Sequence, residues 1–180
     1  MSNDLDIFQL TDRAKRAQRA LATSTTAQRN DILLAISRAI VEHCEQILHA
    51  NAQDCQRAEE HGMAAGLVDR LRLDESRINA ISSAVLDVIA LEDPVGTVIR
   101  GGRTDDGLRV TQLRVPMGVI GMIYEARPNV TVDASILCLK AGNAVILRGG
   151  SAAQNTNETL VEVIRAAIDS LGFSADLVQT

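Results

Sequence analysis

Aromatic side chains are almost absent from this chain of 180 residues, which contains no tryptophan, one tyrosine (Tyr124) and two phenylalanines (Phe8 and Phe173). The core must therefore be aliphatic and rich in alanine, and a 46% hydrophobic fraction is enough to form one. The formal net charge is -5. Because single-stranded nucleic acids are bound by aromatic side chains in basic grooves, we predict no nucleic-acid partner.

Long apolar runs are also missing, since uninterrupted apolar segments such as Ala144–Leu147 are short. A membrane-spanning helix needs about 20 apolar residues, so we predict that no part of the chain crosses a membrane. The three cysteines, Cys44, Cys55 and Cys138, lack metal-ligand spacing and form no even set for disulfides. This cysteine pattern favours a reducing cytoplasm and predicts no metal site.

Residues 1–93 form the first of three predicted segments and are typical of successive helices. Apolar residues recur at helical spacing from Asp31 to His49 and predict one buried stripe. A second stripe runs from Ile78 to Ile89, with Asp74 as its expected N-cap. Gly62 and Gly66 lie between the two stripes and indicate short connections. The segment has no catalytic constellation, and its three histidines are expected on the surface.

The basic residues of the first helix also fit a mitochondrial transit peptide. Such peptides are poor in acidic residues, however, and Asp4, Asp6 and Asp12 lie in the same stretch. We therefore expect an ordinary surface helix.

Residues 94–115 form the second segment and predict an extended, irregular hairpin. Asp105–Gly107 is a strong turn signal, and Gly101–Gly102 is expected to break the strand before it. Apolar residues between Leu108 and Val115 do not alternate strictly, which indicates the irregularity.

Residues 116–180 form the third segment, in which strands and helices alternate. Val119–Tyr124 and Ala144–Leu147 predict buried strands, and helices are expected over Thr131–Lys140 and about Ala153–Leu171. Gly172 is the expected stop of the second helix. Continuous apolar strands separated by helices are typical of a parallel sheet covered on both faces. We therefore predict an α/β fold that contains the first half of such a sheet.

Ligands of open parallel sheets bind at the carboxyl ends of the strands. Two segments follow the predicted strands: Glu125–Asn129 and Arg148–Ser151. Gly149–Gly150 is not a dinucleotide-binding fingerprint and is equally well explained as a turn. Together with Arg148 and Ser151, however, it forms a competent phosphate or ribose contact.

The run from Val115 to Ser151, VPMGVIGMIYEARPNVTVDASILCLKAGNAVILRGGS, closely resembles the glutamate-5-semialdehyde dehydrogenase family, also called gamma-glutamyl phosphate reductases. This family is a branch of the aldehyde dehydrogenase superfamily. The resemblance is most specific in YEARPNVT and KAGNAVILRGGS, and it extends more loosely over the rest of the chain. It implies a Rossmann-type sheet and an NADPH-dependent reduction of L-glutamyl 5-phosphate to glutamate 5-semialdehyde in proline biosynthesis.

The resemblance also implies roles for individual segments. The 94–115 hairpin is expected to mediate homo-oligomerisation. The catalytic cysteine of the family matches none of the three cysteines here, so we expect no catalytic residue in this chain and no activity from these residues alone. That cysteine would lie beyond Thr180.

Site residues are carried over position by position. Arg148 falls where the superfamily usually has an adenosine-contacting lysine, and Ser151 falls where NAD-dependent members often have a glutamate, so NADP is the expected cofactor. Ala126 falls at the superfamily's oxyanion-hole asparagine, a role that Asn129 could take over. The expected substrate-binding residues are Arg127 and Asn129. The expected cofactor-binding residues are Tyr124, Glu125, Ala126, Arg148, Gly149, Gly150 and Ser151.

Several of the polar residues have structural explanations as well. Glu125 could simply pair with Arg127. Lys140 in the last turn and Asp133 in the first turn of the predicted helix would both complement its dipole. Cys138 is expected to be buried and inert.

Two other functions remain open at this point. An NAD-dependent aldehyde dehydrogenase is disfavoured by the arginine of EARPN, since a neutral aldehyde offers it no charge to neutralise. A non-catalytic nucleotide-binding or assembly module would retain the hairpin and the nucleotide site.

Overall fold

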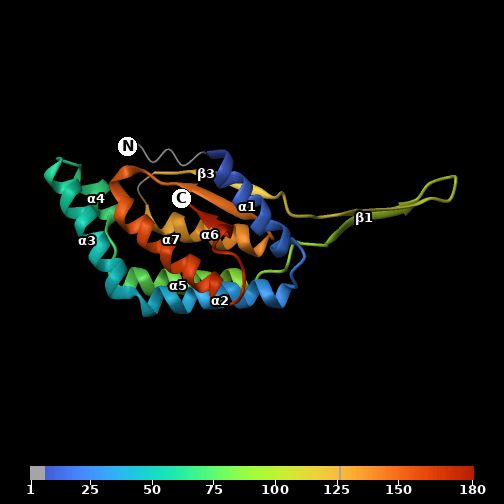
Figure 1. The fold of residues 1–180 in the computed structure, drawn as a ribbon, viewed down its shortest axis with the longest axis horizontal. Helices are drawn as coiled ribbons and strands as arrows, with labels where there is room; N and C mark the ends of the chain where they lie inside the picture. Colours follow the sequence, from blue (N-terminus) through green and yellow to red (C-terminus); the bar gives the residue numbers. More distant parts are fainter. Residues whose placement is uncertain (1–6, 126) are drawn as a thin grey trace.

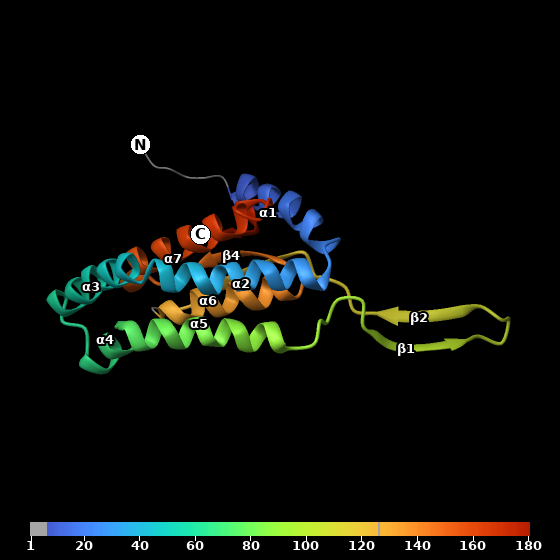
Figure 2. The same cartoon turned by 90° about the horizontal axis from the view of Figure 1, so that it is seen from below.

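The computed structural model describes residues 7–125 and 127–180, which form a layered α/β body and a projecting hairpin (Figures 1 and 2). Helix α1 (Ile7–Ala22) covers one face of a parallel sheet, whose strands lie in the order β3-β4-β5. Helices α6 (Pro128–Lys140) and α7 (Gln154–Asp169) cover the other face. The predicted fold class is therefore confirmed.

An outer layer of helices packs on α6 and α7: α2 (Thr26–Glu42), α3 (Cys44–Glu60) and α5 (Glu75–Ala90). Asp74 caps α5 as predicted, because its side chain accepts a hydrogen bond from the Arg77 N–H. The stripe expected from Asp31 to His49 is not one helix, since α2 ends before His43 and α3 begins after it. The apolar spacing continues across this break because both helices pack against α7. Gly66 lies inside the short helix α4 (Ala65–Leu71) rather than in a connection.

The hairpin consists of β1 (Val98–Arg103) and β2 (Arg109–Leu113), which pair antiparallel. The predicted turn is present, and Gly107 adopts a φ of +86° there. Gly101–Gly102 does not break a strand, because both residues pair within β1. A register shift between Val98 and Arg100 produces the expected irregularity. Every residue of both strands is exposed.

The sheet contains β3 (Val119–Ile123), β4 (Ala144–Arg148) and β5 (Val178–Gln179), all parallel. Strand β4 is buried, as predicted, and it lies between the other two strands. Strand β3 is not buried: it lies at the edge, and its Ile123 is 86% exposed. Helix α6 begins at Pro128 rather than at Thr131, because the fixed φ of proline suits the first helical position. Asp133 consequently lies in the second turn of α6, too far from the N-terminus for the predicted dipole role.

Lys140 connects three helices of the body. Its buried ammonium group donates hydrogen bonds to Asn30 Oδ1 at 2.8 Å and to the Ile89 carbonyl at 2.9 Å. These contacts give Lys140 a structural role between α6, α2 and α5. Within residues 7–125 and 127–180, none of the helices combines the length and apolar character needed to cross a bilayer.

Candidate functional site

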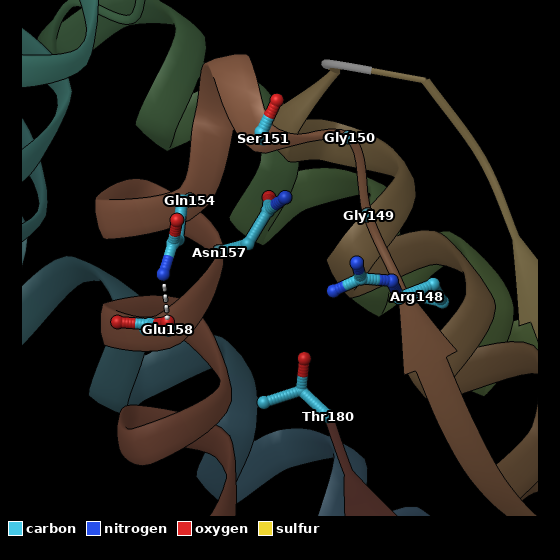
Figure 3. A pocket seen from close by; sticks show the side chains of 8 residues that line it. All are labelled: Arg148, Gly149, Gly150, Ser151, Gln154, Asn157, Glu158 and Thr180. Atoms are coloured by element: carbon cyan, nitrogen blue, oxygen red, sulfur yellow. Dashed lines mark hydrogen bonds between the residues drawn. The ribbon is translucent and has the colours of Figure 1, made fainter. Parts of the chain in front are cut away.

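A pocket lies beyond the carboxyl end of β4 (Figure 3). It brings together all four residues predicted there and adds four others, so that its lining is Arg148, Gly149, Gly150, Ser151, Gln154, Asn157, Glu158 and Thr180. Its volume is about 120 Å³, whereas pockets for whole small-molecule ligands measure about 300–1,000 Å³. The pocket therefore has the size for one part of a larger ligand.

The chain enters this pocket from β4 and leaves it through a turn, Ser151–Ala153, that leads directly into α7. A buried carboxylate from α3 fixes the start of α7. Asp54 accepts hydrogen bonds from the Thr156 N–H at 2.8 Å and from Thr156 Oγ1 at 2.7 Å, and a longer one from the Asn155 N–H at 3.3 Å. These two N–H groups are ordinarily available to an anionic ligand, and here the protein's own carboxylate occupies them.

A chain of side-chain hydrogen bonds lies beneath the Gly149–Gly150 loop. The Tyr124 hydroxyl contacts Thr131 Oγ1 at 2.6 Å, and Thr131 Oγ1 donates to Asn157 Oδ1 at 2.8 Å. Burial raises the pKa of Tyr124. A Cβ at Gly149 would lie only 2.3 Å from Asn157 Nδ2, so this position requires glycine for close approach. Gly149 is therefore not only a turn residue, because it also lets the loop approach Asn157 closely.

Glu125 and Arg127 lie at a second opening, which is lined also by Met63, Leu67 and Arg70 of the α4 region. The two openings share Gly150 and Ser151. In the part of the chain that the structure describes, Glu125 and Arg127 form no side-chain ion pair; only the Arg127 N–H donates to the Glu125 carbonyl, at 2.9 Å.

The remaining predicted site residues do not line either opening in the described part of the chain. Asn129 is exposed in the first turn of α6 and lines neither opening. Tyr124 lies beneath the pocket rather than in its lining. Ala126 falls outside the described residues.

The three thiols are free, and the pKa of each is raised, which disfavours the nucleophilic thiolate form. Burial raises the pKa of Cys138, and burial together with Glu75 and Glu45 raises that of Cys44. Cys138 is half-buried on α6, somewhat less buried than expected. The three histidines are exposed, as predicted, and no group of three potential metal ligands occurs among the residues described.

Residues 2–180 match the model of the aldehyde dehydrogenase family. The chain belongs to this family. It is 54% identical over 166 residues to the gamma-glutamyl phosphate reductase of Kineococcus radiotolerans, a match that covers 92% of this chain and 38% of the relative. It is 53% identical over 169 residues to that of Bifidobacterium longum subsp. infantis, covering 94% of this chain and 39% of the relative. The chain thus spans less than half of these curated relatives.

Solved structures agree with this assignment. The crystal structure of gamma-glutamyl phosphate reductase from Thermotoga maritima has a TM-score of 0.93 and 41% identity, covering 97% of this chain and 42% of that one. The Saccharomyces cerevisiae structure has a TM-score of 0.90 and 34% identity, covering 99% of this chain and 46% of that one. The resemblance inferred from YEARPNVT and KAGNAVILRGGS is confirmed.

Sequence reasoning missed Thr180, which follows β5, and Gln154, Asn157 and Glu158, which line the pocket from the first turns of α7. A signal for the α7 residues was present, because positions 154, 157 and 158 are spaced three and four residues apart and so share one face of a helix that begins at a strand end. Asp54 carried no such signal, since it lies about a hundred residues away from the helix that it caps.

Proposed function

We propose that this chain forms the first part of an NADPH-dependent enzyme that reduces L-glutamyl 5-phosphate to L-glutamate 5-semialdehyde and phosphate, in proline biosynthesis in the cytoplasm. Its relatives at 53% and 54% identity are named gamma-glutamyl phosphate reductases. The observation that carries the proposal is the pocket at the end of β4, where Arg148 and Ser151 lie together. Residues 1–93 would be a helical segment and residues 116–180 the first part of the NADP-binding domain.

The residues of this pocket fit the adenosine end of NADP. Arg148 is exposed and forms no ion pair among the described residues, so its guanidinium is available to a phosphate. Ser151 places a hydroxyl, not a carboxylate, at the ribose, and a phosphate on that ribose meets no repulsion from this position. The ribose would lie on the Gly149–Gly150 loop. The hydrogen-bonded side chains of Tyr124, Thr131 and Asn157 would support that loop from below. When bound, the nicotinamide would supply the hydride.

Arg127 is the proposed partner of the substrate phosphate. It lies at the second opening, next to Glu125 and across the shared Gly150–Ser151 loop from the nucleotide pocket. A fixed guanidinium there would neutralise the acyl phosphate or the charge that develops on the acyl oxygen. Asn129 would assist from the first turn of α6. Unlike Arg127, Asn129 lines neither opening.

The catalytic thiol would come from outside these residues. Cys44 and Cys55 lie on α3, and Cys138 lies on α6 with a raised pKa. None of the three lines the two openings at the strand ends. We therefore propose that these 180 residues alone do not turn over substrate.

The hairpin of residues 94–115 is the proposed site of homo-oligomerisation. Val98, Ile99 and Val110 are each at least half exposed there, and they find no cover within the described chain. A second copy would remove this apolar surface from water.

A chimera tests the cofactor assignment. This chain would replace the aligned segment of the Kineococcus relative, and the chimera would be assayed for phosphate-dependent reduction of NADP or NAD by glutamate semialdehyde. We expect a preference for NADP, and Ser151→Glu should shift it toward NAD because a carboxylate repels the 2'-phosphate. Equal rates with both cofactors would contradict the assignment.

The same chimera tests Arg127. Donors at a developing charge are typically worth about 2.7–4 kcal/mol, so Arg127→Ala should lower turnover about a hundredfold or more. Arg70→Ala is the control, because Arg70 lines the same opening from α4 without a proposed role. An unchanged rate for Arg127→Ala would reduce Arg127 to a structural residue, and inactivity of the chimera with either cofactor would favour a non-catalytic nucleotide-binding module.

A further inference from the structure

Asn157 has a polar group with no protein partner although the residue is only 5% exposed. Its Oδ1 accepts a hydrogen bond from Thr131 Oγ1 at 2.8 Å, but its Nδ2 donates to no atom of the described chain. Nδ2 is not sealed inside the protein, because Asn157 lines the pocket at the end of β4. Figure 3 shows its amide directed toward the Gly150–Ser151 loop. A buried amide with a free donor facing a pocket indicates a ligand.

In the structure, Oδ1 is the amide atom of Asn157 that lies against Thr131. Thr131 has one hydroxyl proton, which it donates to Asn157 Oδ1, so the contact from Tyr124 at 2.6 Å must be a donation from the tyrosine hydroxyl. If the amide were rotated by half a turn, Nδ2 would face the Thr131 hydroxyl and Oδ1 would face the pocket. With Oδ1 paired to Thr131, Nδ2 is the amide atom left for a ligand in the pocket.

A second donor group, the Arg148 guanidinium, also faces the pocket. In Figure 3 the guanidinium of Arg148 points into the pocket from one side, whereas the Ser151 hydroxyl at its upper rim is directed away from Asn157. Neither side chain has a hydrogen-bond partner within the described residues. The one acidic side chain in the lining, that of Glu158, accepts a hydrogen bond from Gln154 Nε2 at 2.9 Å on the side away from Arg148. Convergent donors of this kind fit a ligand rich in acceptor oxygens.

We propose that Asn157 is a nucleotide-binding residue that selects a phosphorylated ribose: its Nδ2 donates to an oxygen of the 2'-phosphate that Arg148 pairs with. This inference rests on the proposed function and extends it, because Asn157 becomes a second determinant of NADP over NAD. Gly149 is part of the same arrangement, since its missing side chain leaves the space that the amide occupies.

The test is isothermal titration calorimetry of the 180-residue chain with adenosine 2',5'-bisphosphate, with 5'-AMP as the probe that lacks the 2'-phosphate. Asn157→Asp keeps the acceptor for Thr131 and replaces the free donor with a negative charge. We expect it to weaken bisphosphate binding by at least about tenfold and to leave 5'-AMP binding within about threefold. Asn155→Asp is the matched control, because Asn155 lies two residues earlier on α7 and its side chain contacts Gln53 outside the pocket.

Each outcome separates the two proposals. Bisphosphate binding that is equally tight in the unaltered chain and in Asn157→Asp overturns the role of Asn157 alone. An unaltered chain that binds bisphosphate no better than 5'-AMP overturns both this role and the NADP assignment. Should the aspartate variant fail to fold, Asn157→Ala removes the donor without adding charge, and equal losses for both probes would then contradict selection of the 2'-phosphate.

Discussion

Ile78 and Ile99 are the same side chain in two different surroundings. Ile78 on α5 is fully buried in the main core, whereas Ile99 on β1 of the hairpin is 52% exposed. The body surrounds its apolar side chains with helices on both faces of the sheet, and the hairpin extends beyond it with both faces open (Figures 1 and 2). The body therefore buries its apolar side chains within itself, whereas the hairpin leaves its own exposed.

Polar contacts divide in the same way. In the body, buried groups such as Asp54, Asn51 and Lys140 connect helices that are distant in sequence. In the hairpin, side-chain contacts such as that of Arg100 with Gln112 connect only its own two strands. The junction is Asp93, which pairs with Arg29 of α2 and accepts a hydrogen bond from the Val95 N–H. Stability and the candidate site thus depend on the body.

The largest difference in the free energy of unfolding is expected when isoleucine is replaced by alanine once in the body and once in the hairpin. Ile78→Ala should lower the free energy of unfolding by about 2–5 kcal/mol, because it leaves a cavity in the core. Ile99→Ala should change it by no more than about 0.5 kcal/mol, because it removes exposed surface. Urea denaturation of both variants checks this. Similar losses for the two would mean that the hairpin is packed against the body in solution.

Asp54→Ala should have the next largest effect. Two backbone N–H groups and the Thr156 hydroxyl at the start of α7 lose a charged acceptor, at an expected cost of about 3 kcal/mol. Asp12→Ala is the control, because Asp12 forms an exposed pair with Arg16 that contributes at most about 1 kcal/mol. If the two variants melted alike, α7 would not depend on its contact with α3.

Gly149→Ala should destabilise the body by about 1–3 kcal/mol, because the new methyl group overlaps Asn157. Gly121→Ala on the neighbouring strand β3 meets open space and should be nearly neutral. Thermal denaturation of the two variants measures the difference. A neutral Gly149→Ala would show that Asn157 is free to move away, and the orientation of its amide would then be wrong.

The smallest effect on stability is expected at Asp93, the junction between body and hairpin, and it depends on pH. Burial acts to raise the pKa of Asp93, but hydrogen bonds from Thr26 and the Val95 N–H and the charge of Arg29 outweigh it and lower the pKa below 3.8. A carboxyl group with a lowered folded pKa contributes stability above its unfolded pKa and loses it as the pH falls through the folded value. Asp93→Asn should therefore flatten the loss of stability that sets in as the pH falls below about 5. An unchanged profile would contradict the coupling to Arg29.

From the sequence alone, the elements with strong local signals were predictable. The Asp74 cap, the Asp105–Gly107 turn and the buried strand β4 each depend on a few adjacent residues, and each was predicted. Exposure of β3 was not predictable, because VIGMIY is equally apolar whether it lies at the centre or at the edge of a sheet. The break at His43 was hidden because α2 and α3 present apolar residues to the same partner helix.

Some residues of the candidate site were predictable from the sequence, and others were not. Arg148–Ser151 was predictable because ligand sites lie at strand ends and because the family resemblance is specific there. The separation of Glu125 and Arg127 into a second opening was not, since it depends on Met63 and Leu67 from the distant α4 region. Asn157 owes its importance to Thr131 and Tyr124, and no local pattern links these three positions.

A titration of the isotope-labelled chain with adenosine 2',5'-bisphosphate, followed by nitrogen–proton correlation NMR, tests the nucleotide site most directly. We predict that the largest shifts occur at Arg148, Ser151 and Asn157, with smaller ones at Thr131 and none in β1 or β2. Shifts concentrated in the hairpin or around Met63, with Arg148 and Asn157 unmoved, would contradict the assignment of the β4 pocket to the nucleotide.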